Sequence, residues 1–188
     1  MLRRIEEFGK YVEITGFRNV KFNNVEDFLN KINKEKLSNV QIQFLDANLV
    51  ATWQHLYFAV LNALTAFNNK QGISKNLAME IMVYASAQRQ IRKATEFIGI
   101  KPNSSNIAVL IVGGKPEAVK STLSTIMKCI DGERDEAILE LSKEKAAIIQ
   151  RAFKISGAEL ETVTGTEGRE KALIDLVIER MALLATQR

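Results

Sequence analysis

The chain is poor in the residues that build disulfides, metal centres and kinks: it has one cysteine, one histidine and two prolines among 188 residues. A single cysteine (Cys129) excludes an internal disulfide, and together with a single histidine (His55) it excludes the usual zinc clusters. No run of about 18 apolar residues suggests a membrane span. The N-terminal residues MLRRIEEFGK contain no apolar core, so they do not read as a secretory signal. We therefore expect a cytoplasmic protein with no metal, no cofactor and no membrane contact.

Composition is typical of a folded globular protein, with 46% hydrophobic and 26% charged residues. A chain of this length can bury a core of its own, and we predict one domain over residues 1–188. The formal net charge is +4, and the six basic and two acidic residues between Lys70 and Lys101 account for all of that excess. Positive charge confined to one region indicates an anionic partner, although a solvated helix face explains the same charges without one.

Hydrophobic patterns predict a small sheet. Residues 11–22 (YVEITGFRNVKF) read as a short hairpin with its turn at Gly16, because β-branched residues lie on both sides of the glycine. Residues 40–47 alternate apolar and polar side chains, which is typical of a half-buried strand. Residues 107–114 (IAVLIVGG) are almost entirely apolar, as in a strand buried on both faces. A further short extended segment is expected around residues 137–141.

Apolar residues at helical spacing predict the helices. They are expected over residues 23–35 with Asn24 as N-cap, 49–67, 75–85, 87–98 with Ser86 as N-cap, 116–130, 142–153 capped by Ser142, and 167–185. The break at Ser86 is expected because serine is a good N-cap and the register of apolar residues changes there. Strands interspersed with helices indicate an α/β or α+β fold, with a small mixed or antiparallel sheet of about three to five strands surrounded by about seven or eight helices.

No catalytic motif can be recognised. In VGGKPEAVKS (112–121), Lys120-Ser121 lies one turn inside the predicted helix, whereas a phosphate loop needs Gly-Lys-Ser/Thr at the helix start. His55 lies among apolar and aromatic helix residues and has no orienting partner nearby in the sequence, which is typical of a packed histidine and not of a catalytic one. The carboxylates are scattered as surface charge. We therefore expect that the protein is not an enzyme.

The segment YASAQRQIRKATE (84–96) joins three small side chains to a cluster of long hydrogen-bond donors. Arg89 and Lys93 are spaced i,i+4 with no acid between them, a repulsion that costs only roughly a few tenths of a kcal/mol in a helix. Small residues beside a helix N-terminus let a sugar-phosphate chain approach free backbone N–H groups. These features indicate an RNA site, while an ordinary solvated helix explains the charges alone. The residues expected to contact RNA are Lys75, Ser86, Gln88, Arg89, Gln90, Arg92 and Lys93.

The C-terminal segment KALIDLVIERMALLATQR (171–188) is more apolar than a surface helix needs to be. Its apolar residues span an arc of about 220° at ~100° per residue, whereas an ordinary amphipathic helix needs little more than ~100°. One side can face the chain's own core, so the excess predicts a partner interface centred on Arg180. A helix wedged deeply into its own domain is the alternative. The residues expected at the interface are Leu173, Leu176, Val177, Arg180, Met181 and Leu184.

Five blocks in collinear order resemble one known family. They are FLDANLVATWQHLYFAVLNALTAF (44–67), KNLAMEIMVYASAQRQIRKATEFIGIK (75–101), IAVLIVGG (107–114), RAFKISGAEL (151–160) and LVIERMALL (176–184). Together they resemble the TPRKB family in its archaeal type, the kinase-binding small subunits of the KEOPS complex. Where the family pattern has Ser-Gly, this chain has Ser86-Ala87. The first ten residues and the tail after Leu184 lie outside the resemblance.

The resemblance implies a non-catalytic subunit of the complex that makes threonylcarbamoyladenosine next to the anticodon of tRNAs. Members bind the small atypical kinase/ATPase of KEOPS, support its activity and help recruit tRNA through its single-stranded 3′ CCA end. The resemblance thus assigns residues 86–93 to RNA and the C-terminal helix to the kinase, in a protein that is monomeric when free. Two other classes stay open: a small-molecule-binding or enzymatic α/β domain, and a structural module that associates through its C-terminal helix.

Overall fold

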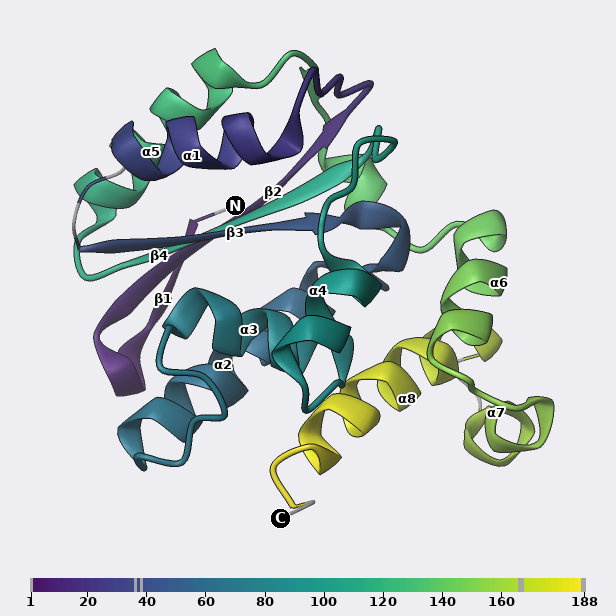
Figure 1. Ribbon diagram of the computed structural model, residues 1–188. Helices are drawn as coiled ribbons and strands as arrows, with labels where there is room; N and C mark the ends of the chain where they lie inside the picture. Colours follow the sequence, from purple (N-terminus) through teal and green to yellow (C-terminus); the bar gives the residue numbers. More distant parts are fainter. Residues whose placement is uncertain (1, 36, 38, 166–167, 187–188) are drawn as a thin grey trace. The chain divides into compact units, whose positions relative to one another are not determined.

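The contacts of the computed structural model, which describes residues 2–35, 37, 39–165 and 168–186, divide the chain into two compact units. Unit 1 spans Met1–Ala47 and Gly99–Ile138, and unit 2 spans Asn48–Ile98 and Leu139–Arg188. Figure 1 follows the chain through both units. The expectation of one domain over residues 1–188 stays a prediction.

Unit 1 is an antiparallel sheet with two helices on one face. Its strands are β1 (Leu2–Ile5), β2 (Lys10–Arg18), β4 (Ile107–Gly113) and β3 (Val40–Asp46), in that order across the sheet, and β5 (Glu133–Arg134), which pairs with the end of β2. The helices α1 (Val25–Glu35) and α5 (Pro116–Cys129) lie together over one face of the sheet (Figure 1). Apolar side chains of the sheet and of both helices form one buried cluster between them. Every residue of the central strand β4 is buried, as its apolar sequence predicts.

The N-terminal hairpin turns at Gly9, so the predicted hairpin with its turn at Gly16 is wrong. Gly9 has the left-handed backbone conformation (φ 57°) that glycine adopts without steric cost. β2 runs straight through Gly16 and pairs with β4 on either side of it. A Cβ at Gly16 would lie 2.5 Å from the Asp135 carbonyl oxygen and 2.5 Å from Cγ1 of Ile138. This glycine therefore marks the close approach of another segment and not a turn.

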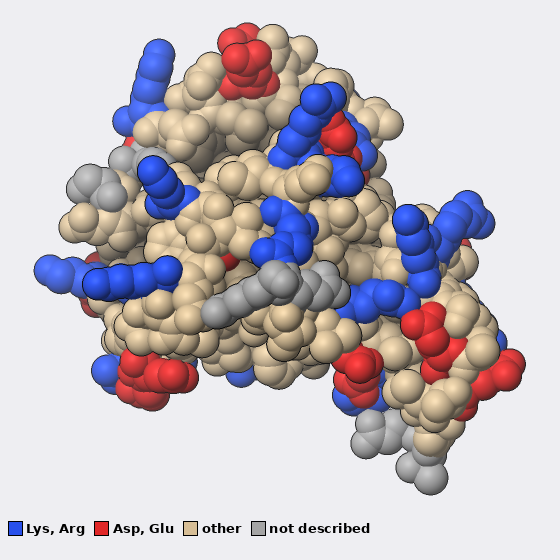
Figure 2. Space-filling view, turned by 60° about the horizontal axis from the view of Figure 1, so that its bottom comes forward, with Lys and Arg blue, Asp and Glu red and all other residues tan. Residues whose placement is uncertain are grey.

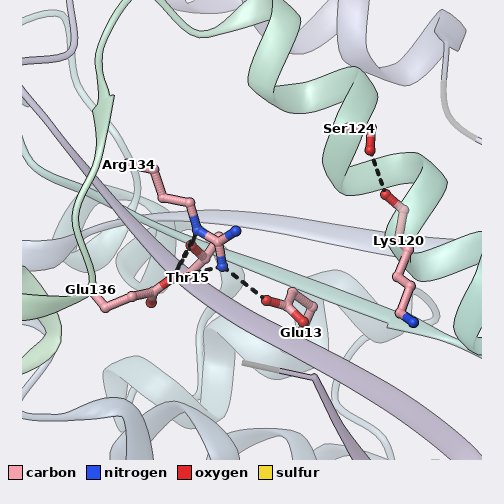
Figure 3. Close-up of polar contacts among 6 residues, drawn as sticks. All are labelled: Glu13, Thr15, Lys120, Ser124, Arg134 and Glu136. Atoms are coloured by element: carbon pink, nitrogen blue, oxygen red, sulfur yellow. Dashed lines mark hydrogen bonds and ion pairs between the residues drawn. The ribbon is translucent and has the colours of Figure 1, made fainter.

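A charged network fastens β5 to β2 (Figure 3). Arg134 donates from Nε to the Thr15 hydroxyl at 2.9 Å and from Nη2 to Glu13 at 3.3 Å, and it forms an ion pair with Glu136 at 2.8 Å. Glu13 and Thr15 are buried, so these contacts satisfy polar groups that would otherwise be costly in the interior. The residues that follow form a 3₁₀ helix over Glu136–Leu139, so the extended segment expected around 137–141 is wrong.

The described residues of unit 2 form helices joined by loops, without a β-strand. Its helices are α2 (Trp53–Asn68), α3 (Leu77–Ser86), α4 (Ile91–Ile98), α6 (Lys143–Ala152), α7 (Gly157–Val163) and α8 (Arg169–Leu183). The helix α8 contacts α2, α3, α6 and α7. Its residues Leu173, Leu176 and Val177 belong to a buried cluster with Phe153 and Leu160. Within the described ranges, every helix is too short or too polar to cross a bilayer.

The predicted fold class is confirmed: the described residues form eight α helices and five antiparallel strands. The predicted caps Asn24 and Ser142 are also confirmed, since their side chains accept hydrogen bonds from the N–H groups of Glu26 and Lys145. The helix predicted over 49–67 begins later, at Trp53, after a 3₁₀ helix over Ala47–Leu49. The last helix begins at Arg169, and its predicted first residue, Glu167, lies outside the described residues.

Helix α7 was not predicted, although the sequence carries a signal for it. Ser156 and Glu159 form a capping box: the Ser156 hydroxyl accepts from the Glu159 N–H at 3.1 Å, and the Glu159 carboxylate accepts from the Ser156 N–H at 2.6 Å. Serine followed three residues later by glutamate is the usual sequence mark of such a helix start.

Candidate functional site

Helix α3 ends where the next helix was predicted to begin. Ala87 has the left-handed conformation (φ 51°), and the Gln88 N–H donates to the Val83 carbonyl at 3.2 Å, which closes the helix end. The predicted break is therefore real, but α4 starts only at Ile91. Ser86 is the last residue of α3 and is 0% exposed; its hydroxyl donates to the Val83 carbonyl. Its assignment as an N-cap is wrong for this reason. Its assignment as an RNA-contacting side chain stays a prediction, against which its burial counts.

The N-terminus of α4 lies four residues beyond the predicted position. The Gln90 carbonyl accepts from the Ala94 N–H at 2.9 Å, so the first free N–H groups belong to Ile91, Arg92 and Lys93. The positive end of the helix dipole therefore coincides with two cationic side chains. Arg89 precedes the helix, so the predicted i,i+4 pairing of Arg89 and Lys93 on one helical face is wrong.

The remaining side chains predicted to bind RNA are accessible. Lys75, Arg89, Gln90, Arg92 and Lys93 are exposed, and Gln88 is half-buried. The Arg92 guanidinium forms an ion pair with Glu96 at 2.8 Å on the outer side of α4, a surface contact that contributes little to stability. Figure 2 shows lysine and arginine side chains spread over one face, with uncharged surface and several acidic groups among them.

A pocket of about 220 Å³ lies beside this segment in unit 2. Its lining comes from the α3–α4 turn, from the ends of α4, α6 and α8, and comprises Ser86, Ala87, Gln88, Phe97, Ala152, Phe153, Lys154, Arg180 and Leu183. Phe97 and Phe153 meet edge to face at 5.3 Å and give the pocket an aromatic wall. Lys154 and Arg180 add two cationic groups. We term this hollow the turn pocket.

The sequence did not identify Phe97, Phe153 and Lys154 as parts of a site. Tyr84, the aromatic residue within the segment 84–96, is buried, whereas Phe97, directly after that segment, is half-buried. Lys154 has a left-handed backbone (φ 54°) after α6. The only sequence signal for Lys154 was its position as a basic residue between the apolar residues Phe153 and Ile155.

Arg180 lies at the turn pocket and braces unit 2 internally. Its Nη2 donates to the Glu159 carboxylate at 2.7 Å and to the Lys154 carbonyl at 3.2 Å. Hydrogen bonds from the backbone and hydroxyl of Ser156, aided by Arg180, lower the pKa of Glu159, so the carboxylate is ionised at neutral pH. The Nε of Arg180 is buried and has no hydrogen-bond partner among the described residues. Arg180 lies beside Gln88, one of the predicted RNA residues, and its place at the centre of a kinase interface stays a prediction.

The apolar excess of the C-terminal helix faces inward. Leu173, Leu176, Val177, Met181 and Leu184 are all buried, because four helices surround α8. The chain itself therefore covers this part of the arc, and the contact of these residues with a kinase stays a prediction. The alternative, a helix wedged into its own unit, describes them.

His55 is a buried structural residue. Its Nδ1 accepts from the Ala51 N–H at 3.2 Å, so Nε2 carries the proton and donates to the Ala85 carbonyl at 2.8 Å. Desolvation, with a smaller contribution from Lys145, lowers its pKa to about 4 against the effect of the Ala85 bond. A neutral imidazole with both nitrogens engaged has no free site for a substrate proton. Among the described residues, no three histidine, cysteine or acidic side chains gather in a way that could hold a metal ion.

Comparison with known families matches most of the chain. The profile of the family described as "Kinase binding protein CGI-121" matches residues 17–185. The "Regulatory protein Cgi121" of Methanocaldococcus jannaschii is 35% identical over 128 residues, which cover 68% of this chain and 80% of that protein. The chain belongs to the CGI-121 family.

Relatives in fungi carry the name of a complex. The "EKC/KEOPS complex subunit CGI121" of Candida glabrata is 26% identical over 187 residues, covering 96% of this chain and 98% of that protein. The corresponding Aspergillus terreus subunit is 25% identical over 154 residues, covering 78% of each. The recognition of the KEOPS small-subunit family is thereby confirmed. β1 and the first part of β2 precede the family match.

Proposed function

We propose that the chain is a non-catalytic subunit of a KEOPS complex that binds the complex's atypical kinase/ATPase and helps recruit tRNA through its 3′ CCA end for threonylcarbamoyladenosine modification. The family description and the names of the relatives support a kinase-binding KEOPS subunit. His55, which is hydrogen-bonded through both ring nitrogens, holds structural elements together.

The observation that carries the tRNA assignment is the meeting of the turn pocket with the basic segment 88–93. The pocket combines an aromatic wall, which suits the face of an unpaired base, with cationic groups that suit phosphates. The free N–H groups at the start of α4 can also bind the phosphates of an RNA backbone. A phosphate oxygen at Arg180 would also satisfy its buried Nε–H. Lys154, Arg180 and Phe97 therefore join the RNA-contacting residues in this proposal, and Ser86 leaves them.

The kinase-binding surface is proposed to lie on the outer side of α2 and α8. Asn62 of α2 and Ala185 after α8 line one small pocket, so these faces of the two helices adjoin. At ~100° per residue, Phe58 shares the face of Asn62, while Ile174 and Ile178 share the face of Ala185. Phe58 is 40% exposed, and the two isoleucines are half-buried. We term Phe58, Ile174 and Ile178 the α2–α8 strip. An accessible apolar strip rimmed by polar residues is typical of a protein interface.

Co-purification with the KEOPS kinase, with and without tRNA, tests this function. We expect a stable complex of the chain and the kinase, a higher rate of ATP hydrolysis by the kinase, and tRNA retained only when the chain is present. Failure of the chain to associate with the kinase, combined with ATP hydrolysis by the chain alone, would show an enzyme of another class. A mass that rises with the concentration of the chain alone would favour a self-associating structural module.

A further inference from the structure

Glu80 is a fully buried carboxylate that holds the backbone of the loop before α3. Its Oε2 accepts from the Ser74 N–H at 2.6 Å and its Oε1 from the Ile73 N–H at 3.1 Å, and the residue is 0% exposed. Charge-assisted hydrogen bonds of this kind are stronger than neutral ones, and losing them leaves buried donors unsatisfied. Glu80 lies in the first turn of α3, where the helix dipole favours a negative charge. Residues 73–74 are therefore fastened to α3 from the inside.

Lys75 lies between two residues that are both anchored. On one side, Glu80 holds the N–H of Ser74, whose hydroxyl accepts from the Asn76 N–H at 3.1 Å. On the other side, the Asn76 side chain caps α3 by accepting from the Met79 N–H at 3.2 Å. The Lys75 side chain itself is exposed. Because its backbone is fixed on both sides, less conformational entropy is lost when its ammonium group binds a phosphate.

The braced loop also borders the basic segment after α3. Gln71 and Ile73 line a pocket of about 100 Å³ together with Tyr84 of α3 and Arg89 of the α3–α4 turn. Ile73, whose N–H donates to Glu80, thus lines the same pocket as Arg89. A loop released from Glu80 would lose its fixed placement beside both cations, Lys75 and Arg89.

We propose that Glu80 is a positioning residue for RNA binding. It holds Lys75, and the pocket-lining residues Gln71 and Ile73, in a fixed position relative to Arg89. This proposal rests on the proposed tRNA recruitment. Its consequence runs against simple electrostatics. Removing a negative charge near a basic surface should strengthen RNA binding, whereas removing a brace should weaken it. The sign of the effect therefore distinguishes the two roles.

The test compares Glu80→Gln with the matched control Glu96→Gln. Both substitutions remove one negative charge near the basic segment, but Glu96 is an exposed partner of Arg92 and braces no loop. Dissociation constants for tRNA are measured over a range of salt concentrations, well below the melting temperature of each variant. We expect Glu80→Gln to weaken tRNA binding about three- to tenfold and Glu96→Gln to leave it unchanged or tighten it. Tighter binding by both variants would overturn the proposal.

A double-mutant cycle with Lys75→Gln separates positioning from general destabilisation. If Glu80 acts through Lys75, Glu80→Gln weakens binding much less in the Lys75→Gln background than in the wild type. Equal losses in both backgrounds would contradict positioning. Should Glu80→Gln fail to fold, Asn76→Ala frees Lys75 from its other side and should weaken tRNA binding with the same dependence on Lys75; independence from Lys75 would overturn the proposal. Absence of tRNA binding by the wild type would instead remove the proposed function itself.

Discussion

His55 donates a hydrogen bond from Nε2 to the Ala85 carbonyl across 2.8 Å, joining the first turn of α2 to the last turn of α3. The accepting residue lies one position before Ser86, at which α3 ends. The imidazole also packs edge to face on Phe153 of the turn pocket at 5.7 Å. The single histidine of the chain therefore supports the position of the predicted RNA segment.

The depressed pKa of His55 predicts acid sensitivity in a defined window. The unfolded chain takes up a proton below its ordinary pKa of 6.5, whereas the folded chain does so only below about 4. The stability that depends on the neutral ring is thus fully present above pH 6.5 and declines as the pH falls to about 4, by about 3 kcal/mol in all. Urea unfolding of the wild type and of His55→Gln at several pH values measures this. The stability advantage of the wild type should shrink across the window; a constant difference would contradict the assignment.

Ala87→Gly should stabilise the protein. Alanine in the left-handed conformation costs about 1–2 kcal/mol, which glycine would relieve. Glycine also raises the entropy of the unfolded chain, which offsets part of this relief and leaves a net stabilisation of about 0.5–1 kcal/mol. Ala85→Gly is the matched control, since Ala85 is buried inside α3 and the same substitution should destabilise by about 1 kcal/mol or more. Thermal unfolding should show melting temperatures that move in opposite directions. Changes of the same sign would mean that the turn at residue 87 is not as described.

The α2–α8 strip makes a separate prediction for the kinase. Phe58→Arg and Ile178→Arg should each weaken kinase binding at least about thirtyfold, because a charged side chain would replace an apolar anchor. Ile148→Arg on α6 is the matched control, since Ile148 is 45% exposed and lies outside the strip. Pull-down with the purified kinase measures the effect. If the control loses binding and the strip variants keep it, the interface lies on another face. Leu176→Arg is unsuitable as a test, because Leu176 is buried and an arginine there would unfold unit 2.

Elements with local signals could be predicted from the sequence, and elements set by distant contacts could not. Asn24 and Ser142 cap their helices through neighbours two or three residues away, so composition alone located them. The turn predicted at Gly16 was wrong because a glycine is required there by the close approach of the Asp135 carbonyl. That residue lies more than a hundred positions away in the sequence. The same holds for Arg134, whose partners on β2 cannot be seen in its own segment.

The candidate site shows the same division. The exposure of Arg89, Gln90 and Lys93 followed from their local pattern, and the structure places them at or beside the start of α4. The position of Arg180 at the turn pocket could not be predicted, because helical periodicity gives the face of a residue and not the elements packed against it. Helices α2, α3 and α6, together with α7, pack against α8 and cover its wide apolar face. Periodicity alone could not show that these helices do so. The contribution of Lys154 depends on a turn after α6 that carries it to the pocket.

The most direct test of the account is tRNA binding by the wild type and by Arg89→Glu/Lys93→Glu, each with intact tRNA and with tRNA lacking its 3′ CCA. Removal of the CCA end should weaken binding to the wild type strongly and change binding to the double variant hardly at all. The double variant should also show a flatter salt dependence, since roughly two phosphate contacts are lost, while it binds the kinase as the wild type does. Equal sensitivity of both proteins to CCA removal would contradict the account and return residues 84–96 to an ordinary solvated segment.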